Sequence, residues 1–136
     1  MLRLGAERNE LNIVADQIGG PTPAADLARA CFKVAEQLRA NPGKSGTYHF
    51  SGCPEVSWAD FARSIFEHAG IDCKVSDIPS GAYPTPAKRP LNSRLDNSRT
   101  QQVFGLDRPG WRNGLDDILS DLGAVSYTHL TLPTKA

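Results

Sequence analysis

The sequence lacks an excess of charge of either sign, and it lacks any long apolar run. Its 136 residues carry 15 Lys and Arg against 15 Asp and Glu, so the formal net charge is zero. A balanced chain of this kind argues against general attraction to nucleic acid or to an anionic membrane, which requires a basic surface. No apolar run approaches the roughly 20 residues of a membrane span. The start, MLRLGAERNE, has no signal-peptide pattern. We therefore expect a cytoplasmic domain without nucleic-acid or membrane partners.

Cysteine is also scarce, and its spacing excludes two kinds of site. Cys31, Cys53 and Cys73 are odd in number and form no CxxC pair, which fits a reducing compartment and not a disulfide framework. We expect each of them to be a small buried apolar residue. His49 and Cys53 are four residues apart, but no further metal ligands gather near them in the sequence.

Glycine-rich phosphate loops are missing as well. The stretch GKSG at 43–46 resembles the end of a P-loop, but Leu38 stands where that motif requires glycine. No GxGxxG follows a predicted strand, so no dinucleotide site is visible. The sequence therefore offers no cofactor motif of its own.

Short apolar segments alternate with helical patterns and indicate an α/β fold. Residues 1–8 read as the last turns of a helix that begins outside this sequence. A helix is predicted over Ala24–Ala40, with Thr22 as its N-cap and Pro23 in its first turn. Ser57 and Asp60 form a capping box before the next helix. Its predicted buried face is Phe61, Ile65 and Ala69, and that of the Ala24–Ala40 helix is Leu27, Cys31, Val34 and Leu38. We predict strands at 11–15, 47–52 and 73–79, and short helices near 98–105 and 114–123.

Two loops remain as candidates for a binding site. DQIGGPTPA places Asp16 and Gln17 directly after a strand, where ligand clefts of α/β folds lie, although a plain turn would also explain its last residues. YPTPAKRPLNSRLD, at 83–96, combines three prolines with Lys88, Arg89 and Arg94. Guanidinium groups bind phosphate through paired hydrogen bonds, and prolines reduce the entropy lost when a loop is ordered. The alternative to a binding loop is an exposed loop whose charges only keep the protein soluble.

The segments VADQIGGPTPAADLA, GTYHFSGCPEVSWADFARSIFE, YPTPAKRPLNSRLDNSR and GWRNGLDDIL occur in this order. Together they resemble the C-terminal part of dTDP-4-dehydrorhamnose reductases, in the extended short-chain dehydrogenase/reductase superfamily. The resemblance covers residues 1–124 and implies a substrate-binding lobe whose Rossmann half is missing. Residues 125–136, VSYTHLTLPTKA, have no counterpart, and we expect them to be a non-native or disordered tail.

The resemblance implies an oxidoreductase that reduces the C4 ketone of dTDP-4-dehydro-L-rhamnose to dTDP-L-rhamnose with NADPH or NADH. In that superfamily a Tyr-xxx-Lys pair delivers the proton, and the Rossmann half binds the cofactor. Neither the Tyr-xxx-Lys pair nor the Rossmann half is expected here. The residues four after the three tyrosines are Gly52, Ala87 and Thr131, and none of them is lysine. The chain is therefore expected to be inactive alone.

The resemblance also implies site residues by loop position. Arg89 is the leading candidate for a diphosphate contact, with Lys88 as a weaker one and Asn92 as a hydrogen-bonding group. Gln17 and Thr22 are candidates for the same cleft wall. Some members use Mg²⁺ bridged between subunits by carboxylates, which implies Glu7 and Asp121 as metal ligands and a homodimer as a partner.

Two alternatives stay open at this point. The chain could be the lobe of another sugar-nucleotide epimerase or dehydratase, or a non-catalytic sugar-nucleotide-binding module.

In the superfamily the segment 47–52 pairs into the large sheet, so its edge would be open in this chain. We therefore expect weak stability or self-association of the chain alone.

Overall fold

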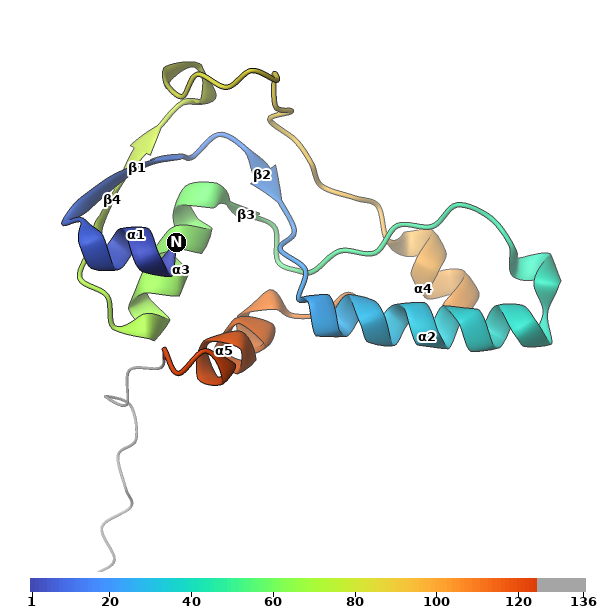
Figure 1. Cartoon of the computed structure of the whole chain (residues 1–136). Coiled ribbons are helices and arrows are strands. Elements are labelled where there is room, and N and C mark those ends of the chain that lie inside the picture. Colours follow the sequence, from blue (N-terminus) through green and yellow to red (C-terminus); the bar gives the residue numbers. More distant parts are fainter. Residues whose placement is uncertain (125–136) are drawn as a thin grey trace, which may run out of the picture.

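The structure is a computed structural model that describes residues 1–124 (Figure 1). Short strands alternate with helices in it, which confirms the α/β class. The predicted tail, 125–136, lies outside the described residues. In chain order the elements are α1 (Leu2–Glu7), β1 (Glu10–Val14), β2 (Ile18–Gly19), α2 (Ala24–Ala40), η1 (Pro42–Lys44), β3 (Val56–Ser57), α3 (Trp58–Ala69), β4 (Lys74–Ile78), η2 (Ser80–Ala82), α4 (Ser98–Phe104) and α5 (Trp111–Asp121).

The larger core lies between the parallel pair β1–β4 and the helices that pack on it. Leu11 of β1 stands opposite Val75 of β4, and α3 contacts both strands as well as α1 and α5. Trp111 of α5 is the largest fully buried side chain. Its ring meets Phe61 of α3 edge-on, with the ring centroids 5.2 Å apart. This favourable aromatic geometry holds the first turn of α3, which borders the site described below.

The start of α3 confirms the capping box predicted from the sequence. Ser57 Oγ accepts a hydrogen bond from the Asp60 backbone N–H at 3.0 Å and donates one to the Asp60 carboxylate at 2.8 Å. Ser57 also belongs to β3, where it pairs antiparallel with Ile18 of β2. The cap therefore links the first turn of α3 to the loop that follows β1.

α2 has the predicted bounds, Ala24–Ala40, but the face that packs on the core is not the one predicted from the sequence. The smaller core consists of Ala30, Phe104 and Leu106, with Val34 and Leu38 partly buried beside them. Leu27 and Cys31 are exposed, so their predicted burial was wrong. In the described residues α2 packs mainly on α4 and η1, which turns Ala30 inward and these two outward. Of the other cysteines, Cys73 is buried as predicted and Cys53 is partly exposed.

Residues 47–52, predicted as a strand, belong to no strand in the described part of the chain. Their backbone bonds to side chains instead. Asn97 Oδ1 accepts from the Ser51 N–H at 2.8 Å, and Arg108 Nε donates to the Ser51 carbonyl at 3.2 Å. The strand prediction was wrong for this chain because side chains occupy positions that a neighbouring strand would fill.

Thr22 is not the N-cap of α2, contrary to the sequence prediction. The N-cap is Pro23, and it makes no side-chain capping bond. Thr22 Oγ1 instead donates to the Gly20 carbonyl and accepts from the Gly52 N–H, both at 3.0 Å. A side chain at Gly52 would put its Cβ 1.9 Å from the Pro21 carbonyl oxygen, so only glycine fits this backbone crossing. Thr22 therefore joins two chain segments and caps no helix.

The stretch 81–91, here called the cationic loop, has both its ends fixed to the segment that follows β1. At its start, the Asp16 carboxylate accepts hydrogen bonds from the Ser80 N–H at 3.0 Å and from Ser80 Oγ at 2.6 Å. At its end, the Ile18 N–H donates to the Leu91 carbonyl at 2.8 Å. Every residue between these anchors is exposed. The loop is thus tethered at two points and open between them.

We expect Asn97→Ala to lower the free energy of unfolding. The change removes the acceptor of the buried Ser51 N–H together with two donated hydrogen bonds, to Ser51 Oγ and to the Leu95 carbonyl. Leaving a buried donor unpaired costs about 1–3 kcal/mol. Urea denaturation followed by circular dichroism measures the loss. Gln102→Ala, at an exposed position of α4, is the matched control. Equal midpoints for the two variants would contradict the role of Asn97.

We expect the Asp16 anchor to weaken in acid. The side-chain and then the backbone hydrogen bonds from Ser80 hold the pKa of the Asp16 carboxyl below its ordinary value. The pKa of the Asp16 carboxyl is therefore lower in the folded state than in the unfolded state. The anchor contributes its full stabilisation of the fold at pH values above the unfolded-state pKa, and this contribution is lost as the pH falls through the folded-state pKa. The Ser80 amide proton shift, followed by NMR against pH, should titrate below the ordinary Asp range. Asp16→Asn should abolish that titration and Asp72→Asn should leave it intact; a Ser80 shift that titrates in the Asp16→Asn chain would exclude the anchor.

Candidate functional site

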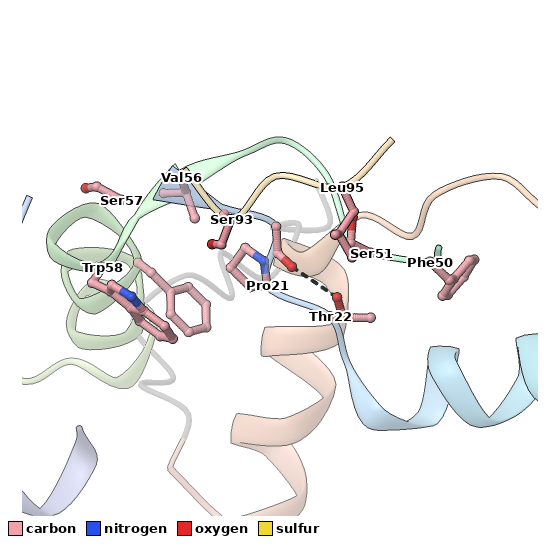
Figure 2. Close-up of a pocket in the computed structure, with 12 residues that line it drawn as sticks. Pro21, Thr22, Phe50, Ser51, Val56, Ser57, Trp58, Ser93 and Leu95 are labelled. Carbon is pink, nitrogen blue, oxygen red and sulfur yellow. Dashed lines mark hydrogen bonds between the residues drawn. The ribbon is translucent and has the colours of Figure 1, made fainter. Parts of the chain in front are cut away.

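Two hollows border both of the loops that the sequence singled out. The large hollow, of about 1080 Å³, is lined by residues of α1, β1 and the cationic loop together with Gln17. The small hollow, of about 200 Å³, is lined by residues 19–22, the β3–α3 junction and Ser93 (Figure 2). Trp58, the first residue of α3, lines both. The two hollows therefore adjoin each other at Trp58.

Charge in the large hollow favours an anionic ligand. Arg8 and Arg89 line it, and Glu10 is the acidic residue that lines it with them. Hydrogen bonds from Ser76 and Lys74 to the Glu10 carboxylate lower its pKa, so this group is ionised at neutral pH and already paired. Two guanidinium groups thus face the hollow beside one carboxylate whose charge is partly neutralised by Lys74. Planar guanidinium groups suit the oxygens of phosphate.

Gln17 lies where the sequence predicted a cleft, at the carboxyl end of β1. It lines the large hollow, as Arg89 does, so the structure brings these two predicted site residues together. Gln17 Nε2 donates to Ser80 Oγ at 2.9 Å, the same hydroxyl that donates to Asp16. Its amide is therefore held in a defined direction next to the start of the cationic loop.

Thr22 lines the small hollow and not the large one. Its hydroxyl already donates to the Gly20 carbonyl, the bond drawn in Figure 2, and accepts from the Gly52 N–H. A ligand can therefore reach only the remaining lone pair of this oxygen. The single cleft wall expected for Gln17 and Thr22 is divided in the structure between two adjoining hollows.

Lys88 and Asn92 lie outside the linings of both hollows. Lys88 is exposed on the cationic loop. Asn92 Oδ1 accepts hydrogen bonds from the Arg94 backbone N–H at 3.1 Å and from Arg94 Nε at 2.8 Å. Its side chain therefore orients Arg94. Contacts of Lys88 and Asn92 with substrate stay predictions.

An ion pair supports the wall of the small hollow from behind. Arg108 Nη1 lies 2.7 Å from a carboxylate oxygen of Glu55, and other nitrogens of the same guanidinium donate to the carbonyls of Ser51 and Gly52. The hydrogen bond from Arg108 holds the pKa of Glu55 below its ordinary value. This arrangement fixes residues 51–55, which lead directly into β3 and Trp58.

Sequence reasoning missed Arg8, Trp58, Tyr83 and Ser93 as hollow-lining residues. Trp58 lies seven residues before the buried Ile65, a spacing that is typical of the same face of a helix. The structure leaves it 54% exposed. Periodicity assigns a face of a helix, but it cannot show that the Trp58 side chain is exposed while Ala59 beside it is fully buried. A tryptophan next to a capping serine and opposite a loop was the only available signal.

The predicted metal ligands do not gather into a site within this chain. Glu7 Oε1 lies 3.5 Å from Arg3 of the same helix, and Asp121 ends α5. In residues 1–124 no three His, Cys, Asp or Glu side chains are grouped as ligands for a metal ion. A Mg²⁺ site that used Glu7 or Asp121 would need carboxylates from elsewhere.

The turn after β1 carries Asp16, whose carboxylate is paired with Ser80, and no GxGxxG cradle stands between β1 and α2. Within residues 1–124 no helix combines the length and the apolar character needed to cross a bilayer.

Comparisons with known proteins agree with the family that the motifs indicated. The family model described as RmlD substrate binding domain matches residues 1–124. A dTDP-4-dehydrorhamnose reductase from Aggregatibacter actinomycetemcomitans is 43% identical over 125 residues, covering 87% of this chain and 42% of its own length. The enzyme of that name from Escherichia coli K12 is 41% identical over 129 residues, covering 90% of this chain and 43% of its own length.

Solved structures give the same result. The chain resembles a dTDP-4-dehydrorhamnose reductase from Clostridium acetobutylicum with a TM-score of 0.82 and 36% identity, over 90% of this chain and 42% of that one. It resembles the reductase from Bacillus anthracis, solved in complex with NADP, with a TM-score of 0.75 and 34% identity, over 88% and 41% of the two chains. The chain thus spans about two fifths of the length of these relatives. It belongs to the family of RmlD substrate binding domains.

Proposed function

We propose that this chain is the substrate-binding part of a dTDP-4-dehydrorhamnose reductase, the enzyme that reduces the C4 ketone of dTDP-4-dehydro-L-rhamnose to dTDP-L-rhamnose. The observation that carries the proposal is the family match over residues 1–124, which includes both loops that line the large hollow. The chain would bind and orient the sugar nucleotide. The order of motifs and the names of the relatives favour this reductase over an epimerase, a dehydratase or a non-catalytic module.

In this proposal the large hollow receives the diphosphate of the dTDP-sugar. Arg89 would contact it, Arg8 would add positive charge, and Gln17 would offer its amide at the carboxyl end of β1. Lys88, exposed on the same loop, would contribute by charge alone, and Asn92 would act by orienting Arg94. Because the cationic loop is exposed between its two anchors, it can adjust to a bound diphosphate without disturbing the core.

The nicotinamide cofactor would act from the three fifths of the relatives that this chain does not span, and the absence of a GxGxxG from the sequence supports this. When bound, NADPH or NADH supplies the hydride for C4. The proposal also includes a cytoplasmic location and a homodimer. A Mg²⁺ ion would be held by Glu7 or Asp121 only together with carboxylates of a second subunit.

We expect Arg89→Ala to weaken the binding of dTDP to the 136-residue chain. A charge-assisted hydrogen bond contributes about 1.5–3 kcal/mol, which corresponds to a rise in Kd of roughly 10- to 150-fold. Isothermal titration calorimetry gives the Kd, and amide shifts of the cationic loop should move on titration of the unchanged chain. Arg29→Ala, on α2 and ion-paired with Asp26, is the matched control. If dTDP moves amides elsewhere while those near Arg89 stay still, the assigned contact is wrong.

We further expect the chain by itself to consume no NADPH in the presence of dTDP-4-dehydro-L-rhamnose. The reason is the division of labour proposed above, in which this chain binds the sugar nucleotide and the cofactor binds elsewhere. Absorbance at the nicotinamide band measures the reaction, with a relative of full length as the positive control. Steady oxidation of NADPH by the purified chain would show that these residues hold a complete active site.

A further inference from the structure

Ser80 joins two polar side chains at the start of the cationic loop. Its hydroxyl donates to Asp16 Oδ1 at 2.6 Å and accepts from Gln17 Nε2 at 2.9 Å. All three residues are partly buried. Gln17 lines the large hollow, whereas Asp16 and Ser80 lie behind it and are not part of the lining. The three side chains therefore form a short hydrogen-bonded row that ends at the hollow.

The charge on Asp16 fixes the direction of both hydrogen bonds. Hydrogen bonds from Ser80 hold the pKa of the Asp16 carboxyl below its ordinary value, so the group is ionised at neutral pH and can only accept. The Ser80 hydroxyl has one hydrogen, which it donates to Asp16, and its oxygen is then left to accept. The part of the Gln17 amide that faces Ser80 must therefore be the NH2 group and not the carbonyl oxygen.

The rest of the Gln17 amide is available to a ligand in a known orientation. It consists of the carbonyl oxygen, Oε1, and one N–H hydrogen. A hydroxyl group can use both, because it donates one hydrogen bond and accepts others. An ionised diphosphate has acceptors alone, so it can use the N–H but is repelled by the lone pairs of Oε1. The amide held in this way is better matched to a hydroxyl group than to a phosphate oxygen.

We propose that Gln17 recognises a hydroxyl group on the sugar of the ligand, and that Ser80, held by Asp16, is the positioning residue that orients the Gln17 amide for it. This inference rests on the proposed function, because it takes the ligand to be a sugar nucleotide whose diphosphate lies at Arg89. Arg89 and Gln17 line the same hollow of about 1080 Å³, so the sugar that follows the diphosphate can reach the amide.

Binding of dTDP-L-rhamnose and of dTDP to the 136-residue chain tests the role of Gln17. Because dTDP lacks the hydroxyl groups of the rhamnose, the ratio of the two Kd values reports their recognition. Gln17→Leu should reduce the preference for dTDP-L-rhamnose by roughly 2- to 12-fold in calorimetry, as expected for the loss of one hydrogen bond between uncharged groups. Gln102→Leu, at an exposed position of α4 outside both hollows, is the matched control and should keep the preference.

Variants of Ser80 separate the positioning of Gln17 from the anchoring of the loop. Ser80→Ala loses the hydroxyl but keeps the backbone N–H that bonds Asp16, so the loop stays anchored while the Gln17 amide is released. It should reduce the preference as Gln17→Leu does, and it should add nothing in the double variant. Ser80→Thr retains a hydroxyl and should restore the preference. Ser45→Ala, at an exposed position after η1, is the control.

The possible failures can be told apart. If the unchanged chain binds dTDP and dTDP-L-rhamnose equally, or if Gln17→Leu keeps the preference, recognition of the hydroxyl by Gln17 is wrong and the proposed function stands. If Gln17→Leu loses the preference while Ser80→Ala keeps it, or if Ser80→Thr behaves like Ser80→Ala, the positioning role of Ser80 is wrong. If the unchanged chain gives no heat with either ligand, the proposed function of this chain fails and the inference fails with it.

Discussion

The site depends on side chains that bond the backbone of irregular segments where a sheet would otherwise do so. Asn97, Thr100 and Arg108 together bond backbone groups of His49, Ser51 and Gly52. Asn97 is 7% exposed, and its amide also holds the Leu95 carbonyl, so one side chain fixes two walls of the small hollow. Buried backbone groups must find partners, and here a few polar side chains supply them. Loss of the Asn97 side chain would release two chain segments together, at Ser51 and at Leu95.

A consequence of this arrangement is that the two hollows differ in rigidity. The small hollow is enclosed by the β2–β3 pair, the Thr22 link between two segments and the Ser57 cap, all of them short and directional bonds. In the described residues, hydrogen bonds fix the cationic loop to the segment after β1 at Asp16 and Ile18. A diphosphate attracts guanidinium groups over several ångströms. The loosely tethered loop thus suits the phosphates of the proposed ligand.

Much of the fold followed from local sequence signals. The Ser57 capping box, the bounds of α2 and the strand at 74–78 depend on neighbouring residues, and the structure confirms each of them. Predictions that required knowledge of distant partners were wrong. The strand at 47–52 was read from β-propensity, which cannot show that Asn97, 46 residues away from Ser51, bonds its backbone. Thr22 was read as a cap because a hydroxyl before proline commonly caps a helix, but its partner is Gly52.

In the candidate site, too, some residues could be predicted from the sequence and others could not. Arg89 and Gln17 could be chosen from sequence because charge and loop position are visible there, and the structure places both in one hollow. Trp58 could not, because its spacing on α3 is that of a core residue, whereas the structure leaves 54% of it exposed. Exposing an indole forfeits the stabilisation that its burial would give. Since the Ser57 cap and the Phe61–Trp111 contact keep the first turn of α3 in place without help from Trp58, the helix can bear that loss. The exposed side chain thereby forms part of the lining of both hollows.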